Sequence, residues 1–183
     1  MRQISMVRFA VILVLGWGGA VLAQQGGGVA PNCPEDAIAL PSELAAWIHP
    51  VPLVAATRQA ELRKAKIVVG QAVLAEMKAT PIVTYSARPA DPGGKVSKGG
   101  MFQLAIKQAG IYRVAISDHA WIDVVSQGKN VQSTSHGRGP ACSGIRKMVD
   151  YRLKSGTYTL QLSAGEQDQL AILVVPHSDE GRN

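Results

Sequence analysis

Apolar and polar residues alternate with a period of two along most of the chain from residue 67 onward. The alternation is clearest in five runs, which are Phe102 to Ile106, Tyr112 to Ile116, Val149 to Leu153, Tyr158 to Leu162 and Leu170 to Val174. A period of two is typical of half-buried β-strands, because successive side chains point to opposite faces of a sheet. Gly- and Ser-containing turns separate the runs, without long helical patterns between them. The pattern predicts an all-β fold: a single antiparallel, jelly-roll-like β-sandwich of about eight or nine strands.

Two pairs of these runs resemble each other. Each pair has a glycine immediately before its second strand and a tyrosine two residues later, at Gly110 and Tyr112 in one pair and at Gly156 and Tyr158 in the other. A glycine at that point accommodates a positive φ, and the tyrosine falls on the core-facing side of its strand. The sequence predicts two similar hairpins. They represent either an internal duplication or two corners with one geometric solution.

The first 23 residues follow another pattern, with arginines at the start, one apolar run and small residues near the end. Val21-Leu22-Ala23 provides residues that a signal peptidase accepts, so this stretch is typical of a secretory signal peptide cleaved before Gln24. The apolar run is shorter than the roughly 20 residues that cross a bilayer. Cys33 lies too far beyond the predicted cut for a lipid anchor. We therefore expect a periplasmic or secreted protein without a stable membrane anchor after cleavage.

The rest of the chain divides by composition. We expect a flexible mature N-terminus over 24–40, a short helical or irregular segment over 41–66 with Ser42 as an N-cap, the sandwich over 67–176 and a C-terminal tail over 177–183. Loss of the leader removes two arginines and no acid, so the net charge falls from +6 to +4. The remaining basic residues are scattered rather than gathered in a stripe, which argues against a nucleic-acid partner.

The mature chain has two cysteines, Cys33 and Cys142. Export places them in an oxidising compartment, where two thiols in one small domain favour a disulfide. The alternatives are a free thiol or a metal ligand. Cys142 lies in a Gly-rich loop with His136, and these two side chains, completed by His119 or His49, would be a copper or zinc ligand set, although the spacing matches no common metal motif.

Two further features suggest a contact surface. Arg146 and Lys147 follow the Gly-rich loop, where two cations and backbone N–H groups would hold a phosphate or carboxylate, or would simply mark a solvated strand end. If Ile122 faces the core, Trp121 and Asp123 share the outer face of their strand, as a contact patch or as a packing cluster under a loop. The candidate surface comprises Trp121, Asp123, His136, Arg146 and Lys147.

The chain also resembles known exported proteins. The segments AGIYRVAI at 109–116 and SGTYTLQL at 155–162 are similar to the jelly-roll sandwich of bacterial pre-peptidase C-terminal domains, which implies a non-catalytic module. The segments WIDVV at 121–125 and HGRGPACSGIRKMV at 136–149 resemble small exported proteobacterial β-sandwich proteins of uncharacterised function. Some of those carry the automatic label homogentisate dioxygenase. That enzyme is a longer cytoplasmic cupin, and its iron ligands are not carried over to any residue here.

We therefore expect an exported, non-catalytic binding or accessory module without a cofactor, whose partner is a protein or a small-molecule ligand. No Gly-x-Ser-x-Gly elbow or phosphate-binding motif suggests an enzyme. The alternative is a metal-binding protein or metalloenzyme that uses histidine and cysteine ligands, including the dioxygenase of the automatic label.

Overall fold

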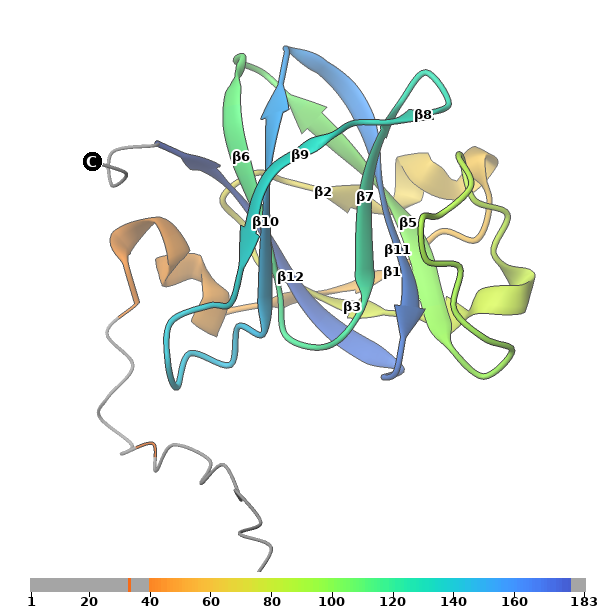
Figure 1. Cartoon of the computed structure of the whole chain (residues 1–183), viewed down its shortest axis with the longest axis horizontal. Helices are drawn as coiled ribbons and strands as arrows, with labels where there is room; N and C mark the ends of the chain where they lie inside the picture. Colours follow the sequence, from red (N-terminus) through yellow and green to blue (C-terminus); the bar gives the residue numbers. More distant parts are fainter. Residues whose placement is uncertain (1–32, 34–39, 179–183) are drawn as a thin grey trace, which may run out of the picture. The chain divides into compact units, whose positions relative to one another are not determined.

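Two β-sheets packed face to face form the core of the protein (Figure 1). The computed structural model describes Cys33 and residues 40–178. The predicted signal peptide, nearly all of the predicted flexible N-terminus and the end of the predicted tail lie outside the described residues. Within the described part the all-β sandwich is confirmed.

The first sheet has six strands in the order β1-β3-β12-β6-β10-β9. Their bounds are β1 Val51–Val54, β3 Val73–Glu76, β12 Gln169–His177, β6 Gly110–Ile116, β10 Lys147–Leu153 and β9 Ser133–Gly137. All of its pairs are antiparallel except β1 with β3. Strand β1 is an edge strand and therefore tolerates Pro52, which has no N–H to donate.

The second sheet has the order β2-β5-β11-β7-β8, and β4 also pairs with β5. Its bounds are β2 Lys66–Ile67, β5 Lys98–Ile106, β11 Gly156–Gly165, β7 Trp121–Ser126, β8 Lys129–Asn130 and β4 Lys78–Ala79. Strands β2, β4 and β8 have two residues each. The described residues therefore contain nine strands of four residues or more, in agreement with the predicted eight or nine.

The strand order is that of a jelly roll. Neighbours β3-β12-β6-β10 in the first sheet face β5-β11-β7-β8 in the second, and the chain crosses to the other sheet between most consecutive strands. This is the arrangement of two interlocked Greek keys. The main core fills the space between the sheets with fully buried side chains such as Phe102, Leu104, Leu160 and Leu162.

The two look-alike segments are not hairpins. Strands β5 and β6 lie in different sheets, as do β10 and β11; β5 pairs with β11 and β6 pairs with β10. The registers match: Tyr158 lies opposite Leu104, and its counterpart Tyr112 lies opposite Tyr151. Each of the two similar tyrosines also donates its hydroxyl to the carbonyl four residues earlier, at 2.8 Å for Tyr112 and 3.1 Å for Tyr158. The repeated sequence therefore forms two equivalent corners between the sheets.

The hairpin prediction failed because period-two alternation is the same whether a strand pairs with its sequence neighbour or crosses to the opposite sheet. The expected positive φ is also found at only one of the two glycines, Gly156, at +154°. The other glycine, Gly110, does not have a positive φ. Tertiary pairing, rather than turn chemistry, relates the two corners.

The sandwich begins earlier than the predicted residue 67. The segment 41–66 contains two 3₁₀ helices, η1 Ser42–Ile48 and η2 Gln59–Lys64, but also β1 and the first residue of β2. Its strands show no period-two pattern because β1 has only four residues and β2 only two. Ser42 is the first residue of η1 rather than its N-cap, which is Pro41.

The sandwich also ends later than predicted, because strand β12 extends to His177, one residue into the predicted tail. A third 3₁₀ helix, η3, spans Thr80–Ile82.

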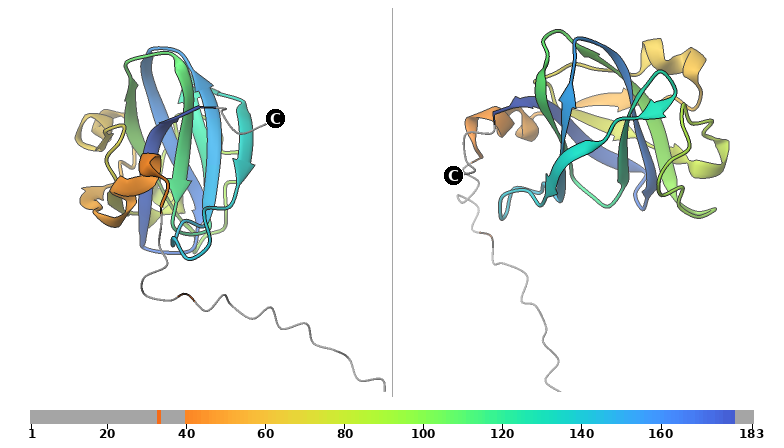
Figure 2. Two further views of the ribbon diagram at one scale, coloured as in Figure 1. Left: turned by 90° about the vertical axis from the view of Figure 1, so that its left-hand side faces the viewer. Right: turned by 45° about the horizontal axis from the view of Figure 1, so that its top comes forward.

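The outer face of each sheet carries a covering segment, and the two segments lie on opposite sides of the sandwich (Figures 1 and 2). Residues 40–48 are called here the N-terminal cover. They include η1, which packs against the first sheet in a second apolar cluster. Residues 83–97, called the loop cover, lie on part of the second sheet. Gly99 makes room for this loop: a Cβ there would lie 2.0 Å from the Tyr85 hydroxyl oxygen.

Candidate functional site

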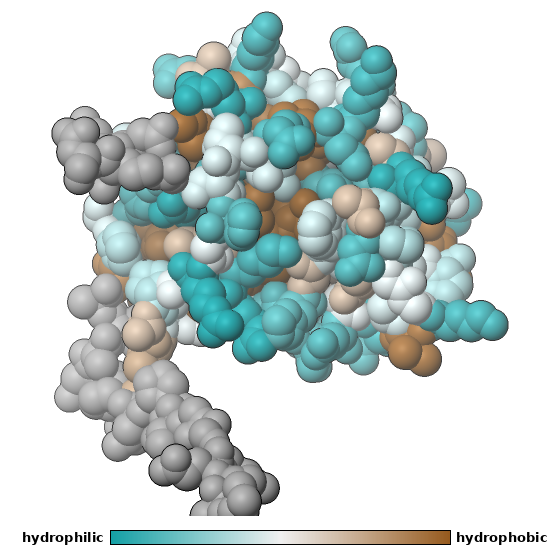
Figure 3. Space-filling view, in the orientation of Figure 1, coloured by the Kyte–Doolittle hydropathy of each residue, from teal (hydrophilic) through white to brown (hydrophobic). Residues whose placement is uncertain are grey.

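An apolar cleft opens where the two sheets separate, between β7 on one side and β9 and β10 on the other. Strand β8 pairs only with the end of β7, so the start of β7 is a free edge. The cleft has a volume of about 170 Å³ and is lined by Trp121, Ile122, Ser133, His136, Lys147, Val149 and Tyr151. Figure 3 shows hydrophobic residues near the centre of this face of the molecule, surrounded by hydrophilic ones. An apolar floor within a polar rim is the general form of a ligand site.

Strand β7 forms one wall. Ile122 faces the main core, as the alternation predicts, and is 4% exposed. Trp121 is 40% exposed at the strand's start, and its indole N–H donates to Asp123 Oδ1 at 3.1 Å. The carboxylate fixes the orientation of the ring, because one face of the strand presents both side chains. The indole of Trp121 therefore has a fixed orientation at the rim of the cleft.

A β-bulge shapes the opposite wall. On β9, Ser133 lies opposite Tyr151 and His136 lies opposite Val149, so three residue steps on β9 match two on β10. The extra residue, Thr134, donates its hydroxyl to the carbonyl of Asp150 at 3.2 Å. Without the bulge an odd separation would place Ser133 and His136 on opposite faces. The bulge brings both to the cleft.

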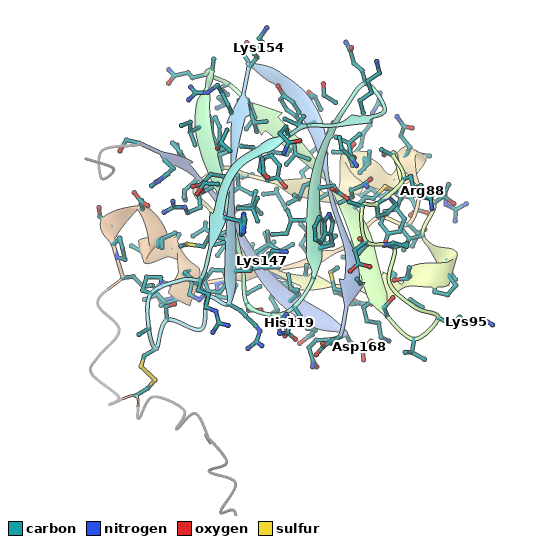
Figure 4. The ribbon with its side chains drawn as sticks, in the orientation of Figure 1. Arg88, Lys95, His119, Lys147, Lys154 and Asp168 are labelled. Carbon is teal, nitrogen blue, oxygen red and sulfur yellow. A yellow bond between two sulfur atoms is a disulfide. The ribbon has the colours of Figure 1, made fainter. Side chains whose placement is uncertain are left out.

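Lys147 links the two walls. Its ammonium group donates to the carbonyl of Ala120 at 3.1 Å and lies 4.9 Å from the centre of the Trp121 ring. Burial lowers the pKa of Lys147, and the carboxylates of Asp123 and Asp91 oppose that shift. An ammonium has three donors, and one carbonyl accounts for one of them. Figure 4 shows Lys147 between β10 and β7.

Tyr151 forms part of the floor. Its hydroxyl donates to the carbonyl of Ile122 at 2.8 Å across the cleft, and its side chain is almost fully buried. Burial, with a smaller contribution from the charge of Asp123, raises the pKa of Tyr151 well above its ordinary value. The phenol therefore remains protonated and bridges the sheets. This residue and Ser133 were absent from the sequence-based surface, although the inward phase of Tyr151 was visible in the alternation.

Asp123 does not belong to the exposed surface. It shares the outer face of β7 with Trp121, as predicted, but it is only 7% exposed beneath the loop cover. The N–H of Ala90 donates to its Oδ2 at 3.4 Å, and Gln161 is its cross-strand neighbour. The alternative interpretation, a packing cluster under a loop, describes Asp123 correctly. Periodicity places a side chain on a face but gives no information about what covers that face.

Arg146 also lies outside the cleft. It lines a separate cavity of about 310 Å³ with Ser117, Arg138, Gly139, Gly144 and Ile145. Adjacent residues on an extended strand point in opposite directions, so Lys147 enters the cleft while Arg146 points away. The structure thus brings Trp121, His136 and Lys147 together and separates them from Arg146.

Cys33 and Cys142 lie at disulfide distance, as predicted, with their Sγ atoms 2.15 Å apart and their Cα atoms 5.5 Å apart. The Cys142 sulfur is therefore joined to Cys33 and does not provide a thiolate for a metal. His119 contacts the Arg146 guanidinium through Nε2, whereas His136 lines the cleft. Within Cys33 and residues 40–178, no three His, Cys, Asp or Glu side chains are grouped as a metal site requires.

Comparison with known proteins does not assign this chain to a family. No family model matches it, and no curated protein is significantly similar to it. Along the described part of the chain, none of the helices has the length and apolar character needed to span a membrane.

Proposed function

We propose that this protein is an exported, non-catalytic binding module, and that its ligand site is the cleft between β7 and β10. The observation that carries the proposal is the combination of an apolar floor with an oriented indole and an ammonium group at the rim. The predicted leader and the cysteine pair at disulfide distance support export to the periplasm or the medium.

The dimensions of the cleft limit its occupant. Small-molecule sites commonly measure 300–1,000 Å³, whereas this cleft has about 170 Å³. It accommodates one compact apolar group, such as a partner's side chain or a small organic acid, rather than a whole cofactor. The remaining donors of Lys147 favour an acceptor, best of all a carboxylate, at the outer end of that group.

A binding role agrees with the state of the titratable groups at the cleft. The Tyr151 hydroxyl is committed to a backbone carbonyl, and burial holds its pKa far from neutrality. Lys147 already contacts Ala120 and the Trp121 ring. Groups engaged in this way support a preformed shape more readily than proton transfer near pH 7.

Two probes of equal size and opposite charge test the proposal. The purified exported protein, labelled with ¹⁵N, is titrated with benzoate and with benzylammonium while backbone amide shifts are recorded. We expect benzoate to shift amides of 121–123, 133–136 and 147–151, because the ring enters the floor and the carboxylate meets Lys147. Benzylammonium binds more weakly because it places a second cation beside the first.

The matched variants are Lys147→Met, which keeps an apolar stem but removes the charge, and Lys129→Met at an exposed site on β8. We expect the first to weaken benzoate binding by about tenfold or more and the second to leave it unchanged. Equal affinity for the two probes, an unchanged Lys147→Met variant, or no shift at the cleft with either probe would overturn the proposal.

A further inference from the structure

The cavity that contains Arg146 is formed by a loop folding back on itself. Gly139 packs so closely on Ile145 that a Cβ at Gly139 would lie 2.4 Å from the Ile145 Cβ and 2.5 Å from its carbonyl oxygen. Only glycine permits this approach. The contact brings Arg138, which precedes the glycine, and Arg146, which follows the isoleucine, to the walls of one cavity.

The loop is held in this shape by its own hydrogen bonds. Ser143 is 5% exposed; its hydroxyl donates to the carbonyl of Pro140 at 2.7 Å and accepts the N–H of Ile145 at 3.1 Å. The N–H of Arg146 donates to the carbonyl of Ile116 at 2.9 Å, which joins the loop to β6. Cys142 joins it to Cys33. The cavity is therefore part of an ordered loop rather than a chance meeting of two long side chains.

Within Cys33 and residues 40–178, the guanidinium groups of Arg138 and Arg146 have no carboxylate partner. Ion pairs with carboxylates involve Arg58, Lys78, Lys98, Arg113 and His177 among the described residues, and neither Arg138 nor Arg146 takes part in one. Arg146 contacts the imidazole of His119, which supplies a lone pair but no full negative charge. Two like charges on one concave surface favour an anion between them.

A hydroxyl completes the donor set. Ser117 Oγ accepts the N–H of Ala171 at 2.9 Å, which leaves its own proton available for donation into the cavity. The neighbouring acid, Asp118, accepts the N–H of its successor His119 at 2.7 Å. Guanidinium groups bind the oxygens of phosphate through paired hydrogen bonds, and a hydroxyl adds a neutral donor.

We propose that Arg138, Arg146 and Ser117 form a binding site for a phosphate group, either the free ion or a phosphomonoester. The site is independent of the cleft: its residues differ, and its ligand needs no apolar body. The sequence predicts Arg146 and Lys147 as the cationic pair, whereas the folded loop pairs Arg146 with Arg138.

The site is tested by titrating the ¹⁵N-labelled exported protein with inorganic phosphate and with glycerol phosphate at constant ionic strength. We expect amide shifts at 117 and 138–146 and none at 121–123. Stronger binding of glycerol phosphate assigns the site to phosphomonoesters, because the 310 Å³ cavity has room for the organic group; stronger binding of inorganic phosphate assigns it to the free ion.

Variants identify the groups responsible. Arg138→Gln and Arg146→Gln each remove one charged donor, and we expect each to weaken phosphate binding by about 10- to 100-fold. Arg88→Gln is the matched control, since Arg88 is exposed on the loop cover, away from His119 (Figure 4). Gly139→Ala keeps both arginines but displaces the loop, and we expect weaker binding there too.

Equal phosphate affinity of Arg146→Gln and Arg88→Gln would overturn the proposal, as would shifts that follow ionic strength alone. Benzoate binding at the cleft is measured in the same variants. Its persistence when phosphate binding is lost separates the two sites, and its loss together with phosphate binding in Arg146→Gln would contradict their independence.

Discussion

The two covering segments enclose the outer faces of the sandwich by different means. The N-terminal cover buries Leu44 and Trp47 against Leu173 and Val175 of β12. The loop cover instead forms hydrogen bonds with polar residues of the second sheet, of which Gln161 is 1% exposed. One cover excludes water with apolar surface, and the other satisfies buried polar groups one by one.

The N-terminal cover is also connected through charges. Arg113 on β6 forms a two-point ion pair with Asp150 on β10, with nitrogen to oxygen distances of 2.8 and 2.9 Å. Its guanidinium also lies 3.4 Å from Glu43 of η1. Asp150 raises the already high pKa of Arg113, so the guanidinium remains charged. The ion pair therefore sits beneath the cover and links it to two strands.

The loop cover depends on the main chain. Gln161 donates to the carbonyl of Ala87 at 3.0 Å and accepts the N–H of the same residue at 3.4 Å. Ser163 donates to the carbonyl of Asp91 at 2.6 Å. A sheet with polar residues on its outer face thus binds a loop through the loop's peptide groups. Apolar burial tolerates small shifts, whereas each of these bonds requires a particular partner.

Both outer faces are thus at least partly occupied by the chain itself. The apolar interior is accessible at the sheet edge between β7 and β10, where the cleft lies. The comparison therefore explains why the proposed ligand site is at an edge.

The largest effect is expected from the disulfide that precedes the N-terminal cover. Cys33 and Cys142 are 109 residues apart in sequence, and closing a loop of that length contributes about 4–5 kcal/mol by chain entropy. We expect the Cys142→Ser variant, and the reduced wild type, to lose about that much free energy of unfolding in urea. Equal unfolding midpoints with and without reductant would contradict the tether.

The next effect concerns the ion pair. We expect Asp150→Ala to lower the free energy of unfolding by about 3–4 kcal/mol, because it removes both carboxylate oxygens of the two-point pair and leaves the half-buried Arg113 guanidinium with Glu43 as its remaining carboxylate partner. Asp168→Ala is the control: Asp168 pairs with Lys98, but its side chain is 78% exposed. That pair contributes less than about 1 kcal/mol. Similar losses in both variants would show that burial does not distinguish the pairs.

A smaller effect is expected on the loop cover. Gln161→Ala removes the partner of both Ala87 groups, and we expect a loss of about 2 kcal/mol in urea unfolding. Gln103 lies in the next row of the same sheet face, and its side chain forms no hydrogen bond within the described residues. We expect Gln103→Ala to cost less than about 0.5 kcal/mol. A loss as large as that of Gln161→Ala would contradict the role of the loop.

The smallest effect depends on pH. The hydroxyl of Tyr85 donates to the carbonyl of Leu162 at 3.1 Å. Burial raises the pKa of Tyr85 above its ordinary value of 10.0, although a hydrogen bond with Thr80 acts in the opposite direction and lowers this pKa. Since the folded-state pKa is the higher one, this contribution is complete below about pH 10 and is lost as pH rises toward the folded-state value. We expect Tyr85→Phe to cost about 1 kcal/mol at neutral pH.

The measurement is the free energy of unfolding of wild type and Tyr85→Phe between pH 8 and 11. The difference between them is expected to shrink above pH 10, while the cost of Asp150→Ala stays constant over the same range. A pH-independent difference for Tyr85→Phe would show that the loop cover does not bury this phenol.

Several structural features were visible in the sequence. The inward phase of Leu170, Ile172 and Val174 is confirmed, since all three lie in the main core. The apolar residues between them already indicated a strand buried on both faces: Leu173 packs on the N-terminal cover. Period-two alternation alone does not indicate this second buried face, which shows instead as a continuous apolar run.

Other features had no local signal. The bulge at Thr134 arises from pairing with β10, and the approach of Gly139 to Ile145 arises from the way the loop closes. Neither follows from residue spacing. Arg138 could have been suspected as a basic residue in the Gly-rich loop, but its pairing with Arg146 could not.

The sequence by itself determined the fold class, the phase of the main strands and the cysteine pair, because these depend on side-chain alternation and on the presence of two thiols in the mature chain. The tertiary structure decided which strands are neighbours, which outer faces are covered and which candidate residues meet. Trp121, His136 and Lys147 meet at one edge because crossings between sheets and a single bulge bring distant segments together. Such contacts depend on long-range packing, which a local residue pattern does not indicate.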